Sequence, residues 1–357
     1  MSFGDPQSGI PNVRPITIFT SYMLLCLSLT ILILRTLYLR FPIQSSSPSS
    51  SKQQTHRSSP IRSFKHVQLF ATLAILSLGI TWYYMLYFFS LSYREWASTH
   101  DVALGGDPEL GLWLKDTRLF KEAWETAVAT PARFWWTQQI FFFTAVWSVF
   151  LGQEGHRRSI PHLWAFMLLG QVAAVSFASN LFFLAVSLSP IRQAQVPKSA
   201  AAKPLTWTPP LILHALSLGV TLISVASIPY CSNSSHFLAI LSTPHLLLFV
   251  PPLLHRVMPR SWGVNCTSSS VADWYYANTY RIILLCALFL QAKVTMEALG
   301  QARGSWGIFE ALYEHPAASS VGWDVIMCWV SWCMWALTGR WEIGDSKAER
   351  GILLKGD

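Results

Sequence analysis

The sequence predicts an all-α protein, a polytopic bundle of about eight membrane-spanning helices with one amphipathic helix at the membrane interface. Two features of composition point to this fold. Of the 357 residues, 52% are hydrophobic and only 12% are charged, whereas soluble domains carry about 25% charged residues to cover their surface. The mean hydropathy is +0.35. A third feature is that the apolar residues gather in long runs, and a helix that crosses a bilayer needs roughly 20 such residues.

Eight apolar runs reach or approach this length, so residues 1–357 are treated as a single transmembrane domain. The first five runs contain no charged residue, and the sixth contains three prolines that are expected to kink it. The predicted spans are Ile16–Leu34, Val67–Leu91, Phe134–Leu151, Leu163–Leu188, Pro209–Ile228, Phe237–Leu254, Tyr280–Leu299 and Val321–Thr338.

Two connections between the predicted spans stand out. Residues 44–60 read QSSSPSSSKQQTHRSSP, a low-complexity composition that predicts a flexible Ser-rich loop. Residues 92–133 form the longest connection, and long loops are often functional. Within it, Trp113–Val128 has helical periodicity, with an apolar stripe opposite a charged face. This segment is predicted to be an amphipathic helix at the interface.

The formal net charge is +8, which in principle favours an anionic partner such as nucleic acid. The basic residues are scattered through short loops between apolar runs, so we interpret them as topology signals and lipid headgroup contacts, with no nucleic acid partner. With eight spans, 15 Lys and Arg fall on the side of the termini and 9 on the other. The positive-inside rule then favours cytoplasmic termini.

The sequence predicts neither a metal site nor a cofactor. The six cysteines are dispersed, and the chain has no CxxC pair, no Cys/His cluster and no aspartate-rich run of the DDxxD type that binds a diphosphate through metal ions.

Asp116 is the first candidate catalytic residue. On a helical wheel it falls within the apolar stripe, between Leu119 and Ala127. A carboxyl buried among apolar side chains stays protonated more readily, as a general acid requires. The alternative is that the helix begins at Thr117 and that Asp116 is only its N-cap.

Three further acids lie in or beside predicted spans, where ionisable residues are costly and often functional. Glu297 is a candidate acid, or else half of an i,i+4 ion pair with Lys293. Asp324 is a candidate acid, or else lies at headgroup depth. Asp273 is a candidate that shares a helical face with Tyr276, or else is an N-cap.

Neutral polar residues within the spans have two possible roles. Four of them either line a polar pocket or only bond between helices, namely Gln138, Gln139, Gln171 and Asn180. The histidines His214, His245 and His255 form no recognisable constellation and are interpreted as core or interfacial residues.

The segments LWLKDTRLFKEAW, RFWWTQQIFFFT, QEGHRRSIPHLWAFMLLGQ and SFASNLF resemble the fungal membrane-bound terpene cyclases of ascochlorin and ascofuranone biosynthesis. The similarity is best over Leu112–Phe183. It implies an isomerase of meroterpenoid secondary metabolism, located in the endoplasmic reticulum or another endomembrane. Such an enzyme cyclises the prenyl chain of an apolar, prenylated small molecule, often through its terminal epoxide. Protonation starts the reaction, so no metal is implied.

Two classes of function are therefore carried forward. The first is a terpene cyclase in which Asp116, Glu297 or Asp324, with Asp273 behind them, donates the proton inside an aromatic-lined cavity. The second is a small-molecule transporter or a scaffold protein of the membrane. A membrane acyltransferase is a weaker alternative, because it needs a reactive histidine with a partner.

Overall fold

The computed structural model describes residues 13–45, 60–102, 109–189, 207–232, 234–266, 269–301 and 304–353, and these residues are almost entirely helical. Five helices are long and apolar enough to cross a membrane, or six if the bent pair α9–α10 is one span. The helices are α1 (Val13–Ser45), α2 (Pro60–Thr99), α3 (Leu110–Asp116), α4 (Leu119–Ala127), α5 (Pro131–Arg157), α6 (Leu163–Val172), α7 (Val175–Ser187), α8 (Leu211–Cys231), α9 (Phe237–Leu247), α10 (Val250–Val257), α11 (Ser269–Gln301), α12 (Trp306–Glu310) and α13 (Pro316–Leu353).

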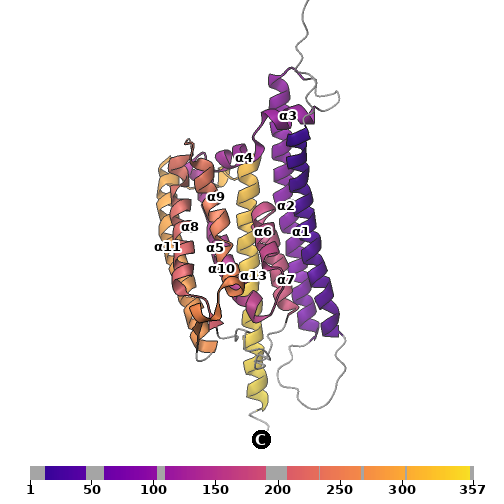
Figure 1. The fold of residues 1–357 in the computed structure, drawn as a ribbon, viewed down its shortest axis with the longest axis vertical. Coiled ribbons are helices and arrows are strands. Elements are labelled where there is room, and N and C mark those ends of the chain that lie inside the picture. The colour runs from indigo at the N-terminus through magenta and orange to yellow at the C-terminus, as the bar shows by residue number, and fades with distance from the viewer. Residues whose placement is uncertain are drawn as a thin grey trace, which may run out of the picture.

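The helices pack around α5 and α13, with α1 and α2 on one side and α8 to α11 on the other (Figure 1). Most of α5 is buried in the main hydrophobic core. We call the end where α1 begins the upper end and the end where α13 finishes the lower end. The one sheet of the described residues, at the lower end, pairs β1 (Trp207–Thr208) antiparallel with β2 (Val264–Asn265).

The predicted fourth span, Leu163–Leu188, is not a single crossing. It folds into α6 and α7, which are half-length helices separated by Ala173 and Ala174. Ala174 has an extended backbone (φ −168°, ψ 137°), so the chain leaves α6 and reverses direction. Apolar composition alone cannot distinguish this hairpin from a span, because both bury the same kind of side chain.

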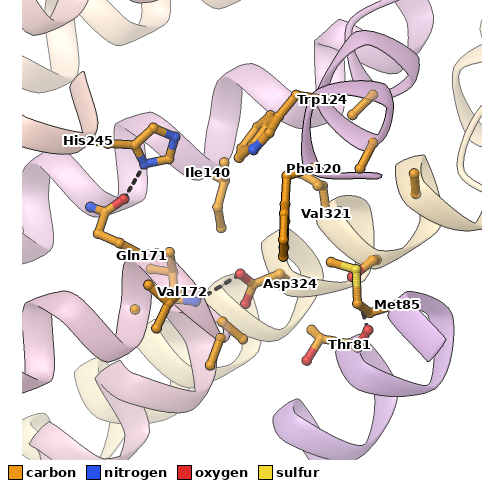
Figure 2. Close-up of a pocket in the computed structure, with 18 of the residues that line it drawn as sticks. Thr81, Met85, Phe120, Trp124, Ile140, Gln171, Val172, His245, Val321 and Asp324 are labelled. Atoms are coloured by element: carbon orange, nitrogen blue, oxygen red, sulfur yellow. Dashed lines mark hydrogen bonds between the residues drawn. The ribbon is translucent and has the colours of Figure 1, made fainter. Parts of the chain in front are cut away.

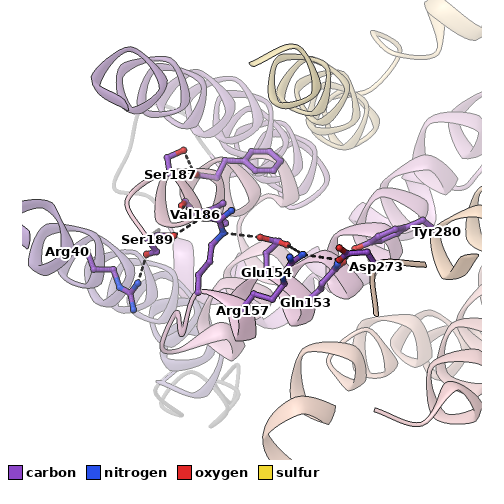
Figure 3. A network of polar contacts seen from close by, with 11 residues as sticks. Arg40, Gln153, Glu154, Arg157, Val186, Ser187, Ser189, Asp273 and Tyr280 are labelled. Carbon is purple, nitrogen blue, oxygen red and sulfur yellow. Dashed lines mark hydrogen bonds and ion pairs between the residues drawn. The ribbon is translucent and has the colours of Figure 1, made fainter. Parts of the chain in front are cut away.

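The two ends of this hairpin meet at the lower end of the bundle. Arg40, near the end of α1, donates hydrogen bonds to the carbonyl of Ser159, before α6, and to the hydroxyl of Ser189, after α7. Arg158 donates to the carbonyls of Val186 and Ser189 at 3.2 and 2.8 Å. Figure 3 shows Arg40, Ser189 and Val186 in the same polar network as Glu154. The α6–α7 pair is therefore a re-entrant hairpin that enters and leaves at the lower end.

Without the hairpin, the described chain passes between the two ends seven times, along α1, α2, α5, α8, α9 with α10, α11 and α13. The sequence predicted that both termini lie on the same side of the membrane. The structure differs, because α1 begins at the upper end and α13 finishes at the lower end (Figure 1). The count of eight spans is likewise not confirmed. The predicted kink of the sixth span is confirmed: α9 and α10 are bent by 46°, and prolines begin α10.

This arrangement redistributes the basic residues of the sequence. Among the described residues, 11 Lys and Arg lie at or beside the lower end and 6 at or beside the upper end, while Arg281 and Lys293 lie within α11. The positive-inside rule therefore favours a cytoplasmic lower end.

The Ser-rich loop, residues 44–60, and the amphipathic segment within residues 92–133 are described by the structure to different extents. Gln44 and Ser45 complete α1 and Pro60 begins α2, while residues 46–59 of the Ser-rich segment lie outside the described residues. The predicted amphipathic helix Trp113–Val128 is broken into α3 and α4. Thr117 has an extended backbone (φ −98°, ψ 155°), and its hydroxyl donates a hydrogen bond to the carbonyl of Trp113 in α3. The Glu122 carboxylate accepts a hydrogen bond from the backbone N–H of Arg118, which satisfies a donor at the start of α4.

Candidate functional site: a cavity at the tip of the re-entrant hairpin

A cavity of about 320 Å³ lies beneath α4, in the upper half of the bundle (Figure 2). Its floor is the tip of the re-entrant hairpin, Gly170 to Val175. The walls come from α1, α2, α5, α9 and α13, and α4 forms the roof. Segments far apart in the sequence therefore contribute to one site, whose volume falls in the range of about 300–1,000 Å³ that is typical of small-molecule pockets.

Asp324 is the acidic residue that lines this cavity among the described residues. It lies two turns into α13 and is only 7% exposed. Its two carboxylate oxygens accept hydrogen bonds from the backbone N–H groups of Val175 and Ser176 at 2.9 and 2.8 Å. These are the first N–H groups of α7, which have no partner within their own helix, and the helix dipole also favours a negative charge there. Asp324 thus caps α7 from another helix.

The other side of the hairpin tip is also satisfied. Tyr22 of α1 donates a hydrogen bond of 2.7 Å to the carbonyl of Val172, the last residue of α6. Because an unpaired buried backbone group costs about 1–3 kcal/mol, the contacts from Tyr22 and Asp324 allow the chain to reverse inside the bundle.

A histidine and a glutamine form a second polar feature of the cavity. The Nδ1 atom of His245 in α9 hydrogen-bonds to Oε1 of Gln171 in α6, and the Gln171 amide donates to the sulfur of Met167 at 3.6 Å. Because an amide oxygen only accepts, Nδ1 carries the proton in this arrangement, and the neutral ring has its lone pair on Nε2.

Aromatic rings surround these polar groups. The ring of His245 meets those of Trp124 and Phe141 edge to face, each with centroids 5.4 Å apart. Tyr22 and Phe120 form a further edge-to-face pair at 4.9 Å. The faces of aromatic rings stabilise a cation through their quadrupoles. The cavity therefore combines a carboxyl group, a histidine and several aromatic rings.

Asp116 lies away from the cavity, although the helical wheel predicted that it lies on an apolar stripe. It is the last residue of α3, its side chain is 39% exposed, and it accepts a hydrogen bond of 3.2 Å from the indole of Trp96 and lies 3.9 Å from His100. The expectation failed because the break at Thr117 rotates α3 relative to α4. The N-cap of α4 is Arg118, so Asp116 is not a cap of that helix either.

Glu297 and Asp273 also lie outside the cavity. Glu297 is 42% exposed on α11, and its carboxylate is 3.8 Å from Lys293, in agreement with the ion-pair interpretation. Asp273 is 51% exposed near the lower end and pairs with Arg157 at 3.1 Å, as Figure 3 shows. It lies inside α11, which begins at Ser269, so it is not an N-cap.

The intramembrane glutamines and asparagine divide between the two expected roles. Gln171 lines the cavity. Gln138 bonds to Gln291 at 2.9 Å and Asn180 to Ser77 at 3.2 Å, so these two link helices. Gln139 accepts from the indole of Trp329 at 3.2 Å. The role of His245 was missed, because its partner is 74 residues away in the sequence and no local motif marks it.

Comparison of the chain with protein-family profiles, with characterised proteins and with solved structures gives no match.

Proposed function

We propose that this protein is a membrane-embedded terpene cyclase, which closes a ring in the prenyl chain of an apolar aromatic substrate without a metal. The observation that carries the proposal is the position of Asp324, a buried carboxyl group that lines an aromatic cavity inside the bundle. An apolar substrate dissolved in the bilayer would reach such a cavity between helices. The resemblance of residues 112–183 to fungal terpene cyclases supports the same reaction class.

Asp324 is the proposed acid. Its two carboxyl oxygens accept hydrogen bonds from the backbone N–H groups of Val175 and Ser176. The same two hydrogen bonds fix the orientation of the carboxyl group, so its proton can be presented in a constant direction.

The reaction proceeds in balanced steps. Asp324 protonates the oxygen of a terminal epoxide, the C–O bond breaks, and the more substituted carbon becomes a cation. The π electrons of a neighbouring double bond form the new C–C bond and move the cation along the chain. Loss of a proton to Nε2 of His245 then leaves a double bond, and the proton returns to Asp324 between turnovers. The product has the mass of the substrate.

The aromatic rings and the roof have separate tasks in this scheme. Trp124, Phe141 and Phe120 lie where cation–π attraction stabilises the migrating charge. The roof formed by α4 keeps bulk water from the cation, which water would otherwise capture as an alcohol. Substitution of a roof residue is therefore expected to divert product toward hydroxylated compounds.

Membranes that contain the protein provide the test. They are incubated with a prenylated phenol that carries a terminal epoxide, and the products are separated by liquid chromatography and mass spectrometry. A new product of unchanged mass, absent with control membranes, is expected. No isobaric product, or only the diol that is heavier by one water, would contradict cyclisation.

The re-entrant hairpin favours a second candidate, a small-molecule transporter. Half-length helices that meet inside the bilayer build the binding sites of many transporters. In the present case, the N-terminus of α7 already receives Asp324, so it has less capacity to bind an anion. Counterflow of a labelled prenylated phenol in proteoliposomes, with no chemical change, would favour transport over cyclisation.

A further inference from the structure

A second hollow, of about 820 Å³, opens at the upper end between the start of α1, the α3–α4 turn and the start of α9. We call it the basic groove. Its apolar surface is formed by Ile18, Phe19, Leu119, Phe120 and Leu238. Its basic side chains are Arg14, Lys115, Arg118 and Lys121, and none of the described residues that line it is acidic.

Within the described residues, most basic side chains of the groove have no acidic partner. Lys121 pairs with Glu125 at 3.1 Å. Arg14, Lys115 and Arg118 form no ion pair with the described part of the chain. Like charges around one hollow repel each other, and a concave surface focuses their field. The groove is therefore suited to an anion, and its apolar residues are suited to a hydrocarbon chain attached to that anion.

The basic groove adjoins the cavity that contains Asp324. Phe120 lines both hollows, and α4 contributes Phe120 to the roof of one and Leu119 to the wall of the other. A molecule whose polar head lay among the basic side chains would thus have its chain beside Phe120, which also lines the cavity. Neither hollow alone combines a basic rim with a buried carboxyl group.

We infer that the basic groove binds the anionic head of an amphiphile with an apolar chain. The inference deepens the proposed function. It rests on that function only for the statement that the chain of this ligand reacts in the cavity. The chemistry that the groove recognises is a phosphate, carboxylate or phenolate on a hydrocarbon chain. Two sources share this chemistry, a free single-chain amphiphile and an anionic membrane lipid.

Binding in nanodiscs of phosphatidylcholine tests this inference without turnover. The probes are a fluorescently labelled dodecyl phosphate and the matching dodecyl alcohol, with empty nanodiscs as the background. The phosphate is expected to bind more tightly than the alcohol, and its affinity is expected to fall as salt rises. Arg118→Gln and Lys115→Gln are each expected to weaken it roughly fivefold, as for loss of one charge near a partly exposed site.

Arg256→Gln is the matched control, because Arg256 is an exposed arginine at the lower end. It is expected to leave the affinity unchanged. Unaltered elution in gel filtration would show that each variant is folded. Equal affinity for phosphate and alcohol, or unchanged affinity in both groove variants, would overturn the inference.

Competition identifies the source of the ligand. Displacement of the probe by phosphatidylserine in the disc would support a lipid as the occupant, and failure of that lipid to compete would support a free amphiphile. Both outcomes agree with an anionic headgroup site. These binding measurements do not depend on product formation. A protein that binds the phosphate but forms no cyclised product would contradict only the cyclase proposal, and a protein that forms the product but does not bind the phosphate would contradict only this inference.

Discussion

The replacement Asp324→Ala removes the group that allows α7 to begin inside the bundle. In the native protein the carboxylate accepts from the N–H groups of Val175 and Ser176 at 2.9 and 2.8 Å. Ala174, the N-cap residue of α7, has no side chain that could replace it. Both N–H groups would therefore remain buried without a partner.

The expected loss follows from these two contacts. An unpaired buried donor costs about 1–3 kcal/mol, so the free energy of unfolding of Asp324→Ala is expected to fall by about 2–6 kcal/mol. Asp324→Asn keeps one acceptor oxygen and is expected to lose about half as much. The matched control is Asp273→Ala, whose 51% exposed side chain makes a surface ion pair worth at most about 1 kcal/mol.

Thermal unfolding in detergent measures these differences through a dye that fluoresces on reaction with thiols. Cys26 and Cys328 are buried and report unfolding when the other four cysteines are replaced by serine. The melting temperature of Asp324→Ala is expected to fall by roughly 3 °C or more, with Asp324→Asn in between. An Asp324→Ala protein as stable as Asp273→Ala would refute the capping role.

Three further predictions concern topology, packing and mechanism. Single cysteines at Lys115 and Arg256 are expected to be labelled from opposite faces of sealed microsomes, with Arg256 cytosolic, and labelling from the same face would contradict the seven passages. Gly170→Ala is expected to lower the free energy of unfolding by about 1–3 kcal/mol, because its Cβ would lie 2.7 Å from the ring of Trp147. The control Gly219→Ala has open space around its Cβ and is expected to be neutral or stabilising in the same unfolding assay. A metal chelator is expected to leave turnover unchanged, and loss of product that magnesium restores would contradict a reaction started by a carboxyl proton.

Hydropathy predicted the membrane bundle correctly because lipid-facing helices are apolar whatever their partners. It could not predict the re-entrant hairpin. The residue that satisfies the tip of the hairpin, Asp324, lies 149 residues from Val175 in the sequence. Helical periodicity likewise placed Asp116 on an apolar stripe, because a wheel assumes a continuous helix and Thr117 interrupts it.

The candidate site was predictable only in part. The rule that ionisable residues in spans mark function selected Asp324 together with Glu297 and Asp273. The structure separates them by burial, since Asp324 is enclosed whereas the other two are about half exposed and paired with cations. The pairing of Gln171 with His245 depends on how α6 and α9 pack, which local sequence does not encode.

The most direct test of the proposed mechanism compares the four candidate acids in one assay. Asp116→Asn, Glu297→Gln, Asp273→Asn and Asp324→Asn are expressed in membranes and supplied with the prenylated phenol epoxide, and the isobaric cyclised product is quantified per folded protein. Because loss of one acid–base group costs about 10²–10⁴ in rate, Asp324→Asn is expected to lose at least about a hundredfold while the other three stay within about threefold of the native protein. Full turnover in folded Asp324→Asn, or a comparable loss in one of the other three, would contradict the assignment of Asp324 as the acid.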